Sequence, residues 1–99
     1  MKFVLFYKGP EAPADASHKG WMTWFAGLGD ALVDIGSPIA KGVVVRADGS
    51  TTASDPTVTI NGYSVIRAKD RNEALELIKD HPYLKAGKNC TIEIFERKR

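Results

Sequence analysis

Residues 62–82 read "GYSVIRAKDRNEALELIKDHP" and place a strand directly before a helix. Positions 63–68 are dominated by β-branched and aromatic side chains, which is typical of a strand. Asp70 is a favourable helix N-cap, and Glu73, three residues later, can complete a capping box. The apolar side chains that follow recur every three or four positions. This stretch therefore predicts a strand over residues 63–68 and a helix over residues 70–81.

A second helical pattern lies nearer the N-terminus. Its apolar residues have the spacing of a helix with one buried face: Trp21, Trp24, Phe25, Leu28, Leu32 and Ile35. Gly36 and Pro38 then provide a glycine stop and a proline that cannot continue a helix. The pattern predicts a helix over residues 18–35.

Three further runs favour strands: "MKFVLFYKG" (residues 1–9), "GVVVRA" (42–47) and "CTIEIFE" (90–96). Residues 48–62 are polar and predict a long connection with at most a short extra hairpin, since "ADGS" and "INGY" both favour tight turns. The order is βαββαβ, which indicates an α+β, ferredoxin-like fold. Right-handed crossovers place both helices on one face of a four-stranded antiparallel sheet.

The composition indicates one globular domain over residues 1–99. A net charge of +2 and 26% charged residues are ordinary values for such a domain. Cys90 is the single cysteine, which excludes an intrachain disulfide and a multi-cysteine metal site. The sequence shows no signal peptide and no membrane-spanning run, so we expect a cytoplasmic protein.

Both faces of the predicted sheet carry apolar side chains, although the helices cover only one. In the first strand Phe3, Leu5 and Tyr7 alternate with Val4 and Phe6. An uncovered apolar face is a patch that soluble monomers avoid. We therefore expect a homodimer that pairs the open sheet faces, or a hetero-partner of the same fold.

His81 is the first candidate for chemistry, because it continues the apolar stripe of the helix predicted over residues 70–81. One interpretation is a helix C-terminal histidine that interacts with the last carbonyls. The other is an imidazole at a cleft between sheet and helix, where it could transfer a proton near neutral pH.

The other candidate residues are aromatic or lie near the first helix. His18 begins that helix and is either a solvent-exposed residue or a second catalytic group. Trp21 is either core or a wall for a planar ligand. Tyr7 and Tyr83 have polar tips that could reach the same pocket, which makes them candidate ligand-binding residues.

Other site classes lack their motifs. The sequence has no HExxH pair, no phosphate-binding glycine loop and no activated serine, so no metal or cofactor is expected. RNA-recognition domains share the βαββαβ order, but "YSVIRA" is not their basic and aromatic motif, so nucleic acid is not expected as a partner.

The chain resembles the YCII-related (DGPF-type) domain family over nearly its whole length. The resemblance rests on "MKFVLFYKG", "GLGDALVDIGSPI", "ADGS", "GYSVIRAKDRNEALELIKDHP" and "KAGKNCTIEIF". It implies a ferredoxin-like protomer whose sheets pair across a dimer, the dimeric α/β-barrel arrangement.

The resemblance also implies a site. The family pattern has a histidine early in the first helix, which His18 resembles, and an aspartate before a proline, where this chain has His81 before Pro82. Some relatives act on small ring compounds by elimination or isomerisation. We therefore expect a small-molecule pocket that serves either proton-transfer chemistry of lyase or isomerase type or ligand binding without catalysis.

Overall fold

The computed structural model describes residues 1–9, 18–54, 59–85 and 87–98. Its elements, in chain order, are β1 (Lys2–Gly9), α1 (His18–Leu28), the 3-10 helix η1 (Gly29–Ala31), β2 (Leu32–Pro38), β3 (Val43–Val45), β4 (Thr51–Ala53), β5 (Thr59–Arg67), α2 (Arg71–Ile78), α3 (Pro82–Lys85) and β6 (Thr91–Glu96).

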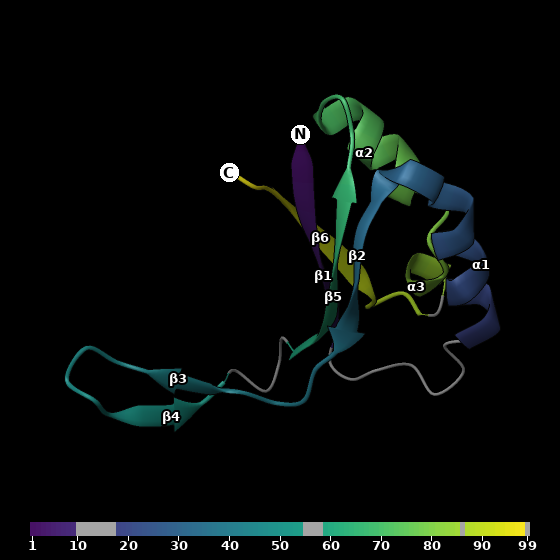
Figure 1. The fold of residues 1–99 in the computed structure, drawn as a ribbon. Helices are drawn as coiled ribbons and strands as arrows, with labels where there is room; N and C mark the ends of the chain where they lie inside the picture. The colour runs from purple at the N-terminus through teal and green to yellow at the C-terminus, as the bar shows by residue number, and fades with distance from the viewer. Residues whose placement is uncertain (10–17, 55–58, 86, 99) are drawn as a thin grey trace.

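Four of the strands form one antiparallel sheet in the order β2-β5-β1-β6. The helices lie together on one side of this sheet (Figure 1). The first and third sheet strands of the chain, β1 and β5, occupy the centre, as the ferredoxin-like arrangement requires. The predicted α+β fold class is confirmed.

The alternation predicted for β1 is also confirmed. Phe3, Leu5 and Tyr7 are buried on the helix side, whereas Val4 and Phe6 are only partly buried on the opposite side. The buried residues of β1 pack with residues of β5, α2 and α3 in a single hydrophobic cluster. This cluster is the core of the domain and the support of the site described below.

The predicted second sheet strand and the predicted end of the first helix are wrong. The helix ends at Leu28, because Gly29 adopts a left-handed conformation with φ of +56°. The chain then pairs with β5 through β2, so residues 32–35 lie in the sheet although their spacing continues the helical stripe. Tertiary pairing overrides the local period here.

The run "GVVVRA" forms a hairpin outside the sheet. Val43–Val45 pairs with Thr51–Ala53, and the turn at Gly49, with φ of +87°, joins the two strands. This hairpin extends away from the rest of the chain (Figure 1). Val43 and Val45 are 68% and 67% exposed. The stretch "INGY", whose Asn-Gly dipeptide is typical of tight turns, is part of β5.

Asp70 caps α2 as predicted, since its carboxylate accepts a hydrogen bond from the amide of Glu73. The Glu73 carboxylate reaches back to the amide of Lys69, one residue before the cap. The predicted end of this helix is wrong, because α2 stops at Ile78. His81 therefore lies between α2 and α3 and is not the last residue of a helix.

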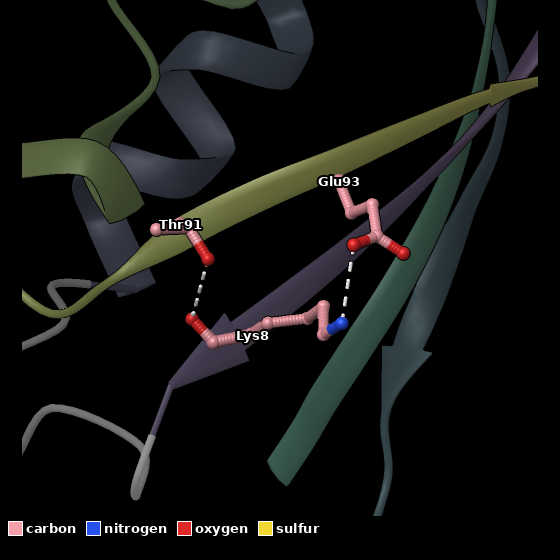
Figure 2. A network of polar contacts seen from close by, with 3 residues as sticks. All are labelled: Lys8, Thr91 and Glu93. Carbon is pink, nitrogen blue, oxygen red and sulfur yellow. Dashed lines mark hydrogen bonds and ion pairs between the residues drawn. The ribbon is translucent and has the colours of Figure 1, made fainter. Parts of the chain in front are cut away.

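The sheet face opposite the helices carries both apolar and charged side chains. Phe6 and Phe95 pack edge to face, with ring centroids 5.7 Å apart. Figure 2 shows the ion pair on the same face, where Lys8 Nζ lies 3.1 Å from Glu93 Oε2. The Thr91 hydroxyl donates to the Lys8 carbonyl at 3.5 Å and ties the edge of β6 to β1.

Candidate functional site

A cavity of about 350 Å³ lies between α1 and the sheet. Trp21, Met22 and Phe25 line it from α1, residues 35–38 line it from β2, and residues 61–64 line it from β5. The remaining described lining residues are Tyr7 of β1 and Tyr83 of α3. A volume in this range is typical of small-molecule sites.

Gly36 determines the shape of the cavity where β2 meets β5. Its φ is +75°, and a Cβ at this position would overlap the carbonyl oxygen of Tyr63. The register between the two strands shifts on both sides of Asp34, and that carboxylate accepts a hydrogen bond from the Gly36 amide at 2.8 Å. The bulged backbone brings Ile35 to the rim of the cavity.

Four residues form a continuous hydrogen-bonded chain that runs along the cavity wall, and His81 is the member behind it. The distance from His81 Nε2 to the Tyr7 hydroxyl is 3.2 Å. The Tyr7 hydroxyl donates to Ser64 Oγ at 2.7 Å. The Ser64 hydroxyl in turn donates to the carbonyl of Ile35 at 2.8 Å. Every member except the Ile35 carbonyl belongs to a side chain that is almost fully buried.

The two ends of this chain fix the position of every proton in it. The backbone amide of Tyr83 donates to His81 Nδ1 at 2.9 Å, so Nδ1 is the acceptor and the ring proton is on Nε2. At the other end the Ile35 carbonyl can only accept, so Ser64 donates to it and accepts from Tyr7. Tyr7 therefore accepts from His81 Nε2–H. This assignment satisfies all the groups without conflict.

His81 also stabilises the start of α3. Its Nδ1 accepts from the second amide of that helix, in the manner of an N-cap side chain, and Pro82 occupies the first helical position. The alternative prediction, a histidine that caps the C-terminal end of the helix, differs from this arrangement, because His81 accepts from an amide at the beginning of α3.

Aromatic rings enclose the His81 imidazole. The centroids of Trp24, Trp21 and Tyr7 lie 4.2, 4.6 and 5.0 Å from it, and Phe25 lies 6.3 Å away. The residue is 0% exposed. Burial in these apolar surroundings lowers the pKa of His81 to about 4, because a charged imidazolium would lose its solvation.

Burial has the opposite effect on the phenol. It raises the pKa of Tyr7 to about 12, although the hydrogen bond to Ser64 works against this rise. The phenol and the imidazole are therefore both neutral at physiological pH. The whole chain from His81 to Ile35 carries no charge.

A second polar contact lies beside the cavity. The Asn61 side-chain amide donates to the Tyr83 hydroxyl at 3.0 Å. Burial raises the pKa of the Tyr83 phenol; the Asn61 hydrogen bond lowers it, while the nearby Cys90 thiol adds to the rise. Asn61 is only partly buried, so its amide can also meet a ligand that enters from solvent.

The structure brings three of the five sequence-predicted site residues to the cavity. Tyr7, Trp21 and Tyr83 line it. His81 does not line it but lies behind Tyr7, one layer further from the opening. His18 is the first residue of α1, and its side chain lies outside the described part of the structure.

Ser64 and Asn61 are members of the site that the sequence reasoning missed. Ser64 interrupts an otherwise apolar run in "YSVIRA" on the side that faces the helices, and a polar residue at a core position is the signal that could have identified it. Asn61 was obscured by the turn-like dipeptide Asn61-Gly62, which lies in a strand.

Within the described ranges, no group of three or more His, Cys, Asp or Glu side chains is placed to hold a metal ion. None of the helices found there has the length and apolar character needed to cross a bilayer.

Comparison with known proteins gives a likeness in structure. No protein-family profile and no curated protein matches the sequence. Among solved structures, 5-chloro-2-hydroxyhydroquinone dehydrochlorinase from Burkholderia phenoliruptrix AC1100, in complex with 2,5-dihydroxybenzoquinone, superposes with a TM-score of 0.56. The alignment covers 99% of this chain and 94% of that chain at 14% identity, so the two proteins are similar in fold.

Proposed function

We propose that this chain is a YCII-related (DGPF-type) protein that binds a small planar ring compound in the cavity between α1 and the sheet. The observation that carries the proposal is the cavity itself, which has a volume of about 350 Å³ and a lining rich in aromatic rings. Trp21 and Tyr83 meet Tyr7 at centroid distances of 4.8 and 5.4 Å, so their rings form a rigid wall. The ring ligand of the structurally similar dehydrochlorinase supports the same ligand class.

Binding without catalysis is the function that the geometry favours. Both ring nitrogens of His81 are engaged in hydrogen bonds, and its low pKa makes it a weak base. A general base needs a free lone pair within reach of the proton that it removes.

Proton-transfer chemistry of lyase or isomerase type is the second candidate. It is favoured by the hydrogen-bonded chain from His81 through Tyr7, because Tyr7 also lines the cavity and links the buried imidazole to it. Turnover of a bound ring compound, lost in His81→Gln while binding persists, would support this candidate. Binding without turnover in the parent protein would support the first.

A matched pair of variants tests the pocket. Ile35 and Ile39 are 42% and 43% exposed, but only Ile35 lines the cavity. Ile35→Arg should obstruct the cavity and weaken ring-compound binding by about tenfold or more, since a charged side chain then replaces an apolar one in the lining. Ile39→Arg should leave the affinity unchanged. Ring compounds found by thermal shift and measured by calorimetry serve as probes, and equal affinity in both variants would contradict the location of the site.

We further propose that the protein is a homodimer paired through the open sheet face. Phe95, at 48% exposure, and the partly buried Val4 and Phe6 form an apolar surface there that the helices do not cover. Phe95→Lys should shift the sedimentation coefficient toward that of a monomer. Leu75→Lys is the control, because Leu75 is 45% exposed but lies on α2. A parent protein that sediments as a monomer at micromolar concentration would overturn the proposal.

A further inference from the structure

The described lining of the cavity has no charged side chain. Its hydrogen-bonding side chains are Tyr7, Ser64, Ser37, Asn61, two further tyrosines and Trp21, whose indole N–H is a donor. A carboxylate that entered the cavity would lose its hydration and meet no cation among these residues. Such an unpaired charge is costly to bury.

Tyr7 and Ser64 form the inner wall of the cavity, and both of their hydroxyl protons are already donated to other groups. The Tyr7 proton is donated to Ser64, and the Ser64 proton to the Ile35 carbonyl. Because the carbonyl can only accept, the direction of this chain cannot reverse. The oxygens of Tyr7 and Ser64 each accept one hydrogen bond and keep one lone pair. At Tyr7 and Ser64 a ligand thus meets acceptors and no free donor.

The mouth of the cavity, formed by Asn61 and Ser37, has no preference for a hydrogen-bond donor on the ligand. The Asn61 amide has both a donor and an acceptor group, so it can pair with either kind of ligand atom. The Ser37 hydroxyl is exposed and bonded to the Pro38 carbonyl. Trp21 and Tyr83 carry an N–H and an O–H group elsewhere in the lining. The preference for a donor therefore applies where a ligand meets Tyr7 and Ser64.

Resting on the ligand pocket proposed above, we propose that the cavity selects uncharged ring compounds whose inner polar group is a hydrogen-bond donor. Ser64 is the positioning residue for this preference, because it holds the Tyr7 proton away from the ligand. The size class follows from the volume. A cavity of roughly 150 Å³ holds benzene, so about 350 Å³ admits a compound of two fused rings.

Three probes of one shape test the proposal: 2-naphthol, 2-naphthaldehyde and 2-naphthoate. Calorimetry at pH 7.0 should give the tightest binding for the naphthol, because it can donate to the inner wall. The aldehyde, which only accepts, should bind more weakly, and the carboxylate should bind about tenfold or more weakly than the naphthol.

Ser64→Ala should release the Tyr7 proton toward the cavity. The ratio of naphthol to aldehyde affinity should then fall by roughly two- to tenfold, the factor that one hydrogen bond contributes. Ser54→Ala is the matched control, since the Ser54 hydroxyl also donates to a carbonyl, that of Gly42, but in the hairpin. Its ratio should equal that of the parent protein.

The outcomes separate the two proposals. If none of the three probes binds the parent protein, the ligand pocket itself is wrong. If all three bind with similar affinity, or the carboxylate binds best, the pocket stands and its selectivity is overturned. An unchanged ratio in folded Ser64→Ala overturns the role of Ser64, and the comparison of the three probes in the parent protein holds even if that variant does not fold.

Discussion

Tyr7 and His81 are 74 positions apart in the chain, yet the phenol oxygen of one lies 3.2 Å from Nε2 of the other. The contact joins the central strand β1 to the segment between α2 and α3. It also links Tyr7 in the cavity wall to His81, the buried N-cap residue of α3.

Removal of the Tyr7 hydroxyl should destabilise the fold. Tyr7→Phe leaves His81 Nε2–H without its acceptor, and a buried unsatisfied group costs about 1–3 kcal/mol. Urea denaturation measures the change. Tyr63→Phe, on the neighbouring strand and outside the chain of hydrogen bonds, should change the free energy of unfolding by less than about 0.5 kcal/mol. Equal effects of the two variants would contradict the structural role of the chain.

His81 should make stability depend on pH in a defined window. Its pKa is about 4 in the folded protein and 6.5 when exposed, so between these values the unfolded state binds a proton that the folded state does not. The free energy of unfolding should therefore decrease as the pH falls from 6.5 to 4, by up to about 1.4 kcal/mol per pH unit from this group. Denaturation curves across this range measure the slope.

The variant His81→Gln isolates that contribution. Other titrating groups are common to both proteins, so the difference between their pH profiles belongs to His81. We expect the profile of the variant to be flatter between pH 4 and 6.5. Parallel profiles would mean that the imidazole is protonated in the fold.

Gly36 should tolerate no side chain. Gly36→Ala would force a Cβ into the Tyr63 carbonyl and should cost more than about 4 kcal/mol or prevent folding. Gly29→Ala is the control, because Gly29 also has positive φ but has open space around it. Its cost should be limited to about 1 kcal/mol of backbone strain. Thermal denaturation of both variants provides the comparison.

The N-cap of α2 offers a simpler test. Asp70→Ala removes the acceptor of the Glu73 amide and should reduce the free energy of unfolding by about 0.5–2 kcal/mol. Asp80→Ala, just beyond the same helix, should have a smaller effect. Chemical denaturation at neutral pH measures both changes. An unchanged free energy of unfolding in Asp70→Ala would argue against the cap.

The sequence predicted the parts of the fold that depend on local patterns. The alternation of Phe3, Leu5 and Tyr7 and the cap at Asp70 depend on residues near in sequence, and both were predicted correctly. The strand at 32–38 could not be recognised, because Leu32 and Ile35 fit a helical period and only pairing with β5 decides between the two structures.

The candidate site was predictable to a similar extent. The amphipathic or planar side chains of Tyr7, Trp21 and Tyr83 predict a place at a ligand pocket, and all three line the cavity. The contact of His81 with Tyr7, and of Tyr7 with Ser64, arises from packing between elements distant in sequence. No local spacing encodes such a chain, so its direction and its consequence for the ligand required the structure.

The β3–β4 hairpin should open without unfolding of the four-stranded sheet. Its strands pair with each other and with no strand of the four-stranded sheet among the described residues, and its valines are exposed. A lone two-stranded hairpin is marginally stable in water. In a protomer without a covering partner, the hairpin amides should exchange with deuterium through local opening. The amides of β1 and β5 should exchange much more slowly, because their exchange requires global unfolding.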